Sequence, residues 1–142
     1  MAVSRIFWDT NLWVYLIEDF GELSQQVADL RGHMLERGDE LCTSALSLGE
    51  VLVKPFEERN DSLARAFEDA IARTTLVIPF DSAAARIYAR IRTNRSIRPP
   101  DAIQLACAAQ AQSDLFVTND DRLTRTRVPG VQFITSLANA PI

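Results

Sequence analysis

Two patterns of apolar residues alternate along the chain. Short runs rich in β-branched and aromatic residues have the length of strands, and between them apolar residues recur every three or four positions, as in amphipathic helices. The runs predicted as strands are residues 3–8, 41–43, 76–78, 115–118 and 131–134. Strands separated by helices are typical of parallel sheets, because each crossover lays a helix on a face of the sheet. The pattern therefore predicts an α/β fold with a mostly parallel sheet of about five strands.

The helical stretches begin and end at recognisable residues. Asp61 and Asp81 are expected to cap helices, Gly38 is expected to end one, and Pro99 opens another because proline is tolerated in a first turn. A helix that starts near residue 45 is expected to end before Pro55, since the residue before proline avoids helical torsions. The apolar positions of the helices fall within residues 12–19, 23–34, 45–53, 63–71, 87–91 and 102–111.

Length and composition indicate an ordinary globular domain. A chain of 142 residues is predicted to form a single domain, residues 1–142. No apolar run is long enough to cross a bilayer, and the start of the chain lacks the features of a secretion signal, so we expect a cytoplasmic protein with no membrane contact. Cys42 and Cys107 are far apart and lie in apolar surroundings, which predicts two reduced core residues.

The net charge is −4, from 15 basic and 19 acidic residues, yet the basic residues are clustered. Lys54 is the only lysine, so arginine supplies almost all the positive charge. The two arginine groups are Arg86, Arg90, Arg92, Arg95 and Arg98, and Arg122, Arg125 and Arg127. Guanidinium groups suit bidentate phosphate contacts, although the same residues also fit solvated helix faces and surface ion pairs.

Four acidic residues occupy positions that predict a common site. Asp9 and Asp120 follow strand-like runs, whereas Glu50 and Asp101 interrupt otherwise apolar helical stretches. In open parallel sheets, ligands bind at the carboxyl ends of the strands, where such acids would converge. Clustered carboxylates need a positive partner, and without nearby His or Cys residues the expected partner is a hard cation, Mg²⁺ or Mn²⁺. This is the chemistry of a metal-dependent phosphodiesterase.

Each acid also has a purely structural explanation. Asp9 is a good helix N-cap, residues 47–50 fit a capping box that uses Glu50, and Asp101 would be favoured by a helix dipole. Asp120 would cap a short turn. None of these roles explains why strand ends separated by most of the chain carry acids, so the combination favours a shared site.

The four acids lie in segments that can be matched to a known family. The segments are residues 7–11, 43–50, 100–106 and 115–120. In this order they resemble the PIN domain family, and in particular the VapC-type ribonuclease toxins. The resemblance implies a three-layer α/β/α sandwich, bound Mg²⁺ or Mn²⁺, an RNA substrate, and Asp9, Glu50 and Asp101 as the principal metal-binding and catalytic carboxylates. Asp120 would complete the site directly or through water.

The same resemblance implies partners and leaves one position open. Toxins of this type are usually neutralised by an antitoxin encoded beside them, in a type II toxin–antitoxin system, and they commonly form homodimers. Asp121 competes with Asp120 for the last position, but the family pattern favours Asp120, with the Thr118 hydroxyl placed to orient it.

The expected reaction is endonucleolytic hydrolysis of RNA by metal-activated water. His33, on the polar side of its helix, is expected to be a bystander, and Asn11 is either a contact to the scissile phosphate or an ordinary turn residue. The alternative is a catalytically silent module that binds nucleic acid or protein. A haloacid dehalogenase-type phosphatase is disfavoured because Asn11 replaces an expected acid. A receiver-like domain is disfavoured because no lysine follows Lys54.

Overall fold

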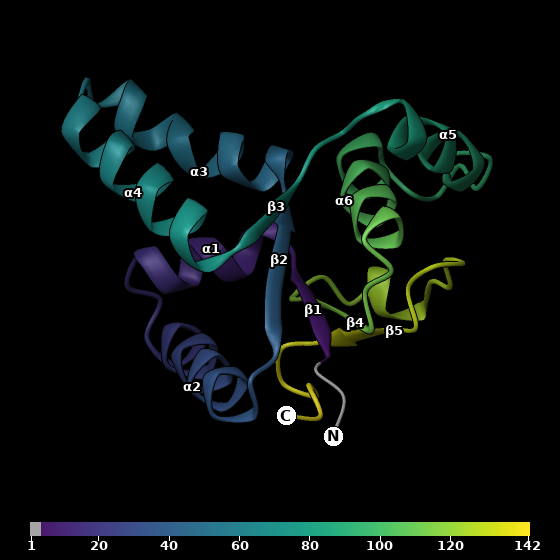
Figure 1. Ribbon diagram of the computed structural model, residues 1–142, viewed down its shortest axis with the longest axis horizontal. Helices are drawn as coiled ribbons and strands as arrows, with labels where there is room; N and C mark the ends of the chain where they lie inside the picture. Colours follow the sequence, from purple (N-terminus) through teal and green to yellow (C-terminus); the bar gives the residue numbers. More distant parts are fainter. Residues whose placement is uncertain (1–3) are drawn as a thin grey trace.

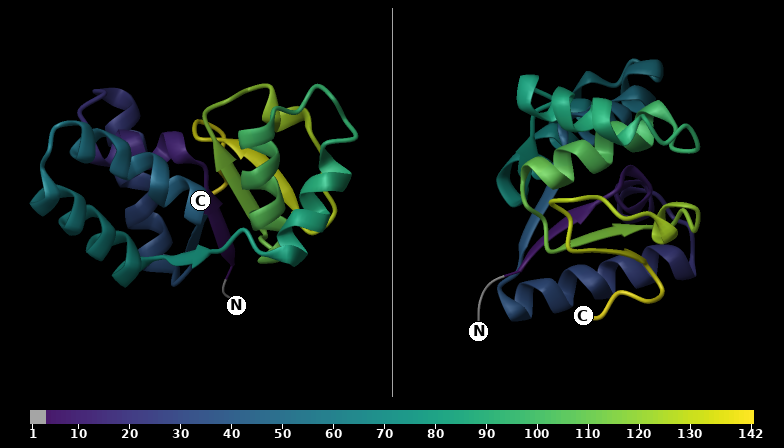
Figure 2. Two further views of the ribbon diagram at one scale, coloured as in Figure 1. Left: turned by 90° about the horizontal axis from the view of Figure 1, so that it is seen from above. Right: turned by 90° about the vertical axis from the view of Figure 1, so that its right-hand side faces the viewer.

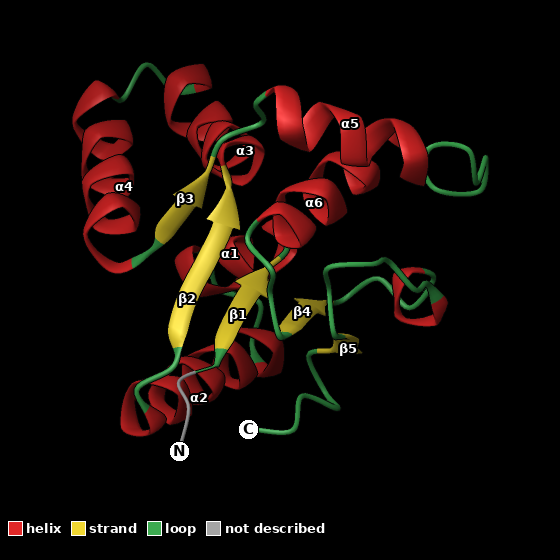
Figure 3. Ribbon diagram, turned by 45° about the vertical axis from the view of Figure 1, so that its right-hand side comes forward, coloured by secondary structure: helices red, strands yellow, loops and turns green. Residues whose placement is uncertain are grey.

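All five predicted strands form one sheet in the computed structural model, which describes residues 4–142. Every neighbouring pair of strands is parallel, and the order across the sheet is β3-β2-β1-β4-β5 (Figure 3). The strands are β1 Arg5–Trp8, β2 Glu40–Ser44, β3 Leu76–Ile78, β4 Leu115–Thr118 and β5 Phe133–Ser136. Val3, expected to begin the first strand, lies outside the described residues.

Helices cover both faces of the sheet and give the three layers that the resemblance implied (Figures 1 and 2). The helices are α1 Thr10–Ile17, α2 Glu22–Arg37, α3 Ala45–Glu57, α4 Asp61–Thr74, α5 Ser82–Ile91, α6 Pro99–Gln110 and the short 3₁₀ helix η1 Leu123–Arg125. One core cluster joins one face of the sheet to α1, α2, α3 and α4, and the other joins the opposite face to α5 and α6. None of the helices within residues 4–142 is both long and apolar enough to span a bilayer.

The alternation of side chains along the central strands explains why both faces need cover. Ile6 and Trp8 of β1 enter one core cluster, while Phe7 between them enters the other. In β4, Val117 likewise belongs to the first cluster and Phe116 to the second. Phe7 and Phe116 stack with their ring centroids 5.2 Å apart. Strands that are apolar on both faces are typical of a parallel sheet buried between helical layers.

Several boundaries differ from the predicted ones. Helix α3 was expected to end before Pro55 but continues to Glu57. Proline loses its own helical hydrogen bond and its ring crowds the carbonyl one turn earlier, but the side chain of Pro55 is fully buried, and this packing favours keeping it in the helix. Strand β5 begins at Phe133 rather than residue 131, because Val131 packs in the core while its amide bonds to Val128 within a turn.

The predicted caps are mostly confirmed. Gly38 ends α2 with a φ of 76°, a left-handed conformation that glycine adopts without steric cost, and Asp81 caps α5 through the amide of Ala84. Asp61 is not a cap, because the Asn60 side chain takes that role for α4. Cys42 and Cys107 are buried and free, as predicted.

The order of the strands places a crevice at one point of the sheet. The chain proceeds from β1 to β2 and β3 on one side, then returns to build β4 and β5 on the other. The direction of winding therefore reverses between β1 and β4. Such a switch point, at the carboxyl ends of the strands, is where open α/β sheets bind ligands.

Candidate active site

Asp9 lies at this switch point, directly after β1, and two hydrogen bonds fix its carboxylate. Its Oδ1 accepts the amide of Thr10 at 2.9 Å as the N-cap of α1, and its Oδ2 accepts the Thr118 hydroxyl at 2.7 Å. Only 7% of Asp9 is exposed. The capping role proposed from the sequence is thus real, but it uses only one of the two carboxylate oxygens.

Thr118 joins Asp9 to the segment after β4. Its hydroxyl donates to Asp9 and accepts the backbone amide of Asp120 at 3.0 Å. The predicted hydrogen bond between the Thr118 hydroxyl and Asp120 is present, but it is made to the backbone amide, because the single hydroxyl proton goes to Asp9. Thr118 therefore fixes the backbone of Asp120 relative to Asp9.

Glu50 projects from α3 toward the start of α1. Its Oε1 accepts the Thr10 hydroxyl at 2.7 Å, so Thr10 bonds to Asp9 through its amide and to Glu50 through its side chain. The capping box predicted at residues 47–50 does not form. Helix α3 is capped three residues earlier by Ser44, which accepts the amide of Ser47 at 3.0 Å.

Asp101 and Asp120 are linked by an arginine that the sequence had not connected to them. The Arg122 guanidinium forms two bonds to Asp120, from Nε to Oδ1 at 3.0 Å and from Nη2 to Oδ2 at 2.5 Å. The same Nη2 lies 3.8 Å from Asp101 Oδ2. Asp121 is exposed, and its side chain forms no hydrogen bond or ion pair with any residue between 4 and 142. Of the two neighbouring acids, Asp120 is the one that faces the others.

The pKa values of the acids show that they act on one another. Burial raises the pKa of Asp9 to about 6, opposed by the hydrogen bonds from Thr118 and Thr10 and reinforced by the charges of Asp101 and Glu50. Burial also raises the pKa of Asp101, together with the charge of Asp120. The pKa of Asp120 is lowered, chiefly by its hydrogen bond from Arg122. Four acids from remote parts of the sequence therefore share one electrostatic environment.

Whether the acids suit a metal ion depends on their chemistry and their spacing. The donors are carboxylate oxygens, which hard divalent cations prefer, and the pKa of Asp9 is raised chiefly by burial and further by the charges of Asp101 and Glu50, both of which a bound cation would offset. As the side chains are placed, no three His, Cys, Asp or Glu residues within the described range are close enough to hold one ion. Arg122 supplies the positive charge between Asp101 and Asp120. The chemistry of the donors fits Mg²⁺ or Mn²⁺, and holding one ion requires the Arg122 guanidinium to turn away and the acidic side chains to move closer together.

Comparison with known families agrees with this geometry. The family model described as the PIN domain matches residues 6–129, a range that includes all four acids. The chain belongs to the PIN domain family. A comparison with curated protein sequences gave no match.

Solved structures with the same PIN fold include several VapBC complexes. VapBC2 of Rickettsia felis, bound to a promoter DNA fragment, has a TM-score of 0.72 at 17% identity, covering 93% of this chain and 98% of that one. DNA-bound VapBC of Salmonella typhimurium has a TM-score of 0.71 at 21% identity, with coverages of 95% and 99%. VapBC-5 of Mycobacterium tuberculosis has a TM-score of 0.61 at 21% identity, with coverages of 92% and 98%. At these identities the likeness establishes the fold.

A network of buried polar side chains holds together the helices next to the acids of this PIN domain. Gln104 of α6 is 2% exposed, and its Nε2 donates to the hydroxyls of Thr10 and Ser47, each at 2.8 Å. Its Oε1 accepts the Ser44 hydroxyl at 2.5 Å. The network ties the starts of α1 and α3 to α6. The role of Gln104 was not predicted from the sequence, although a glutamine inside an almost wholly apolar helix indicates a buried polar contact.

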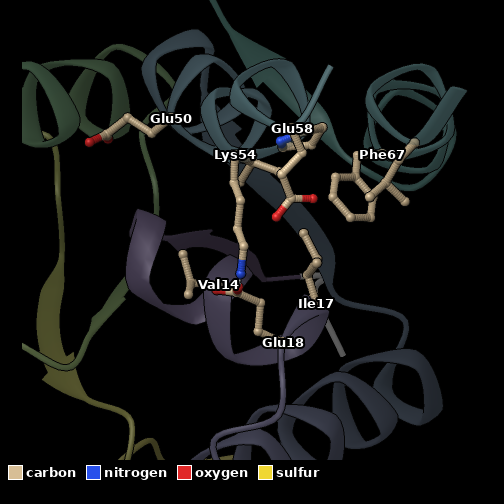
Figure 4. Close-up of a pocket in the computed structure, with 10 residues that line it drawn as sticks. Val14, Ile17, Glu18, Glu50, Lys54, Glu58 and Phe67 are labelled. Carbon is tan, nitrogen blue, oxygen red and sulfur yellow. Dashed lines mark hydrogen bonds and ion pairs between the residues drawn. The ribbon is translucent and has the colours of Figure 1, made fainter. Parts of the chain in front are cut away.

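A groove extends from Glu50 between α1, α3 and α4 (Figure 4). It encloses about 440 Å³ and has apolar walls that include Val14, Ile17 and Phe67. Lys54 reaches across the groove to form an ion pair with Glu18. The groove therefore offers both apolar surface and charged groups beside the acidic cluster.

The other predicted polar residues lie outside the acidic cluster. Asn11 accepts the backbone amide of Asn119 through its side chain at 3.3 Å, which ties α1 to the loop after β4. Asn11 is therefore not the ordinary turn residue expected as the alternative to a phosphate contact, because it lies in the first turn of α1. His33 is exposed on α2, as expected of a bystander.

Proposed function

We propose that this PIN domain is a cytoplasmic, Mg²⁺- or Mn²⁺-dependent endoribonuclease that hydrolyses RNA phosphodiester bonds, and that it is the toxin of a type II VapBC toxin–antitoxin system. The observation that carries the proposal is that Thr10, Thr118 and Arg122 link four acids beside the β1/β4 switch point of a PIN fold, namely Asp9, Glu50, Asp101 and Asp120. These four acids are the proposed metal-binding and catalytic residues.

The proposed roles follow from how the side chains are held. Asp9 is fixed by Thr118 and Thr10, and with a pKa of about 6 it is mainly ionised at neutral pH and ready to bind a cation. Glu50 would face the same cation from α3, oriented by the Thr10 hydroxyl. A bound divalent ion would supply an activated water and stabilise the leaving oxygen. No side-chain nucleophile is needed.

An RNA cleavage assay tests the metal site directly. The protein is incubated with unstructured RNA in Mn²⁺ or in EDTA, together with Asp9→Asn and the matched control Asp121→Asn. We expect cleavage by the wild type and the control in Mn²⁺ only, and a loss of at least 100-fold in Asp9→Asn, the scale of losing a key electrostatic contribution. Full activity in EDTA or in Asp9→Asn would refute the proposal.

We also propose an antitoxin partner and a homodimer. The structural neighbours are VapBC toxin–antitoxin complexes, which supports an antitoxin, and the groove of Figure 4 is a suitable place for its segment to cover Glu50. Expression of the wild type should arrest growth, and Asp9→Asn or co-expression of the adjacent gene should relieve the arrest. Light scattering on the purified chain tests the dimer.

A silent PIN-like module that binds nucleic acid or protein is the second candidate. It is favoured by one observation: Arg122 already neutralises Asp101 and Asp120, and no three acids in the described residues surround one point. RNA binding without cleavage in Mg²⁺, Mn²⁺ and EDTA alike would favour this module over the nuclease.

A further inference from the structure

The charges of this acidic protein are segregated along the chain. Residues 82–100 and 122–142 together carry eight of the 15 basic residues and none of the 19 acidic residues. The first segment forms α5 and the loop to α6, and the second begins with η1 and the loop to β5. Helix α5 and the stretch from η1 toward β5 lie on the same side of the molecule, opposite α4 (Figure 1).

The two segments meet in one basic groove of about 710 Å³. Arg90 lines it from α5, while Arg122, Arg125 and Arg127 line it from η1 and its neighbours. Among the described residues of the lining, none is acidic and none is aromatic. Two arginine groups that are separated in sequence therefore face one hollow, which we call the arginine groove.

Most of the positive charge in the arginine groove is not neutralised. The ion pairs found among residues 4–142 include none with Arg90, Arg125 or Arg127, and Arg122 is the only lining arginine that is paired. The explanation of these arginines as partners in surface ion pairs therefore fails for three of the four. Arginines with free guanidinium forks, gathered in a concave surface, form a site for a polyanion.

The arginine groove is continuous with the acidic cluster. Arg122 lines the groove and contacts both Asp120 and Asp101. Arg98, which precedes α6, also acts on this pair, because its charge opposes the rise in the pKa of Asp101 and helps to lower the pKa of Asp120. An RNA strand bound in the groove would therefore reach Arg122, the residue that contacts two of the acids.

We infer that the arginine groove binds the phosphodiester backbone of the RNA strand on one side of the cleavage point, an inference that rests on the proposed nuclease function. The four guanidinium groups that line the groove suit bidentate contacts to phosphates, and the lack of aromatic lining leaves no surface on which bases would stack. The groove therefore contributes affinity without reading sequence, as phosphate contacts do.

RNA binding in EDTA tests the inference without requiring cleavage. Fluorescence anisotropy with a labelled oligouridine, over about 50 to 200 mM salt, compares the wild type with Arg90→Gln/Arg127→Gln. The matched control is Arg65→Gln/Arg73→Gln, which removes two exposed arginines from α4 on the other side of the molecule. Because each single-strand phosphate contact contributes about 0.7 to the slope of log affinity against log salt, the groove variant should lose about 1.4 from the slope and bind on the order of 20-fold more weakly near 0.1 M salt.

The outcomes separate this inference from the proposed function. In Mn²⁺, the groove variant should show a raised KM with kcat nearly unchanged, whereas the control should match the wild type in both. Equal weakening of the two variants, unchanged binding by the groove variant, or no RNA binding by the wild type would overturn the inference. If binding depends on the arginine groove but neither the wild type nor any variant cleaves RNA, the groove stands and the nuclease proposal fails.

Discussion

Neutralising Asp9 should stabilise the metal-free protein at alkaline pH while removing activity. Raising the pKa of this carboxyl from 3.8 to about 6 corresponds to roughly 3 kcal/mol of folding free energy. Because the folded state binds this proton more tightly than the unfolded state, the stabilising contribution is fully present below about pH 4 and is lost as the pH rises through 6. Asparagine has no proton to lose and keeps an oxygen for the Thr10 amide. We expect Asp9→Asn to be more stable than the wild type by roughly 2 to 3 kcal/mol near pH 8, and similar to it near pH 4.

Urea unfolding in EDTA at about pH 4, 6 and 8 measures this difference. Asp121→Asn is the control, since it removes an exposed carboxylate next to the site. Subtracting the wild-type unfolding free energy from that of Asp9→Asn at each pH isolates the contribution of Asp9 from other titrating groups. A difference that does not change with pH, or an Asp9→Asn protein that is less stable at pH 8, would refute the idea that Asp9 is held ionised against its burial.

Three further substitutions test the arrangement of the site. Thr118→Val removes the hydroxyl that joins Asp9 to the Asp120 amide and should cost about 1 to 3 kcal/mol of stability in urea unfolding; an unchanged midpoint would contradict this. Arg122→Gln removes the guanidinium that competes for Asp120, so calorimetric titration should show tighter Mn²⁺ binding without RNA, and equal or weaker binding would contradict the competition. Asp120→Asn should weaken Mn²⁺ binding whereas Asp121→Asn should not, and equal losses would show that the choice of Asp120 over Asp121 as the fourth acid is wrong.

Local pattern was sufficient for the elements but not for all their boundaries. The continuous apolar run of Ile6, Phe7 and Trp8 predicted a strand, and the structure divides these side chains between the two core clusters. The continuation of α3 through Pro55 and the late start of β5 after Val131 depend on burial against distant elements. Such tertiary packing leaves no trace in the residues next to the boundary, so a local rule for proline or for apolar runs misplaces it.

The acids of the site were visible in the sequence because each stands at a strand end or in an apolar helix. The polar residues that support the acids were not visible, because they bond to residues far away in the sequence. The hydrogen bonds of Gln104 to Thr10 and Ser44 join residues 94 and 60 positions apart. The role of Arg122 was missed for a different reason. It lies only two residues from Asp120, but whether its side chain folds back on that acid or extends into solvent is a choice of rotamer that the sequence does not fix.

The two halves of the site are held in different ways, which indicates where it can adjust. Asp9 is buried and fixed by Thr118 and Thr10, and Thr10 is itself bonded to the buried Gln104. Moving Asp9 would break several buried hydrogen bonds, each costly to leave unmade. The ion pair between Arg122 and Asp120 is different, because the arginine side chain is 54% exposed and exposed ion pairs contribute little net stability. Rearrangement on binding a cation should therefore be confined to the more exposed side of the site: the Arg122 guanidinium turns from Asp120 toward the arginine groove that it already lines, and the carboxylates of Glu50, Asp101 and Asp120 turn toward the fixed Asp9.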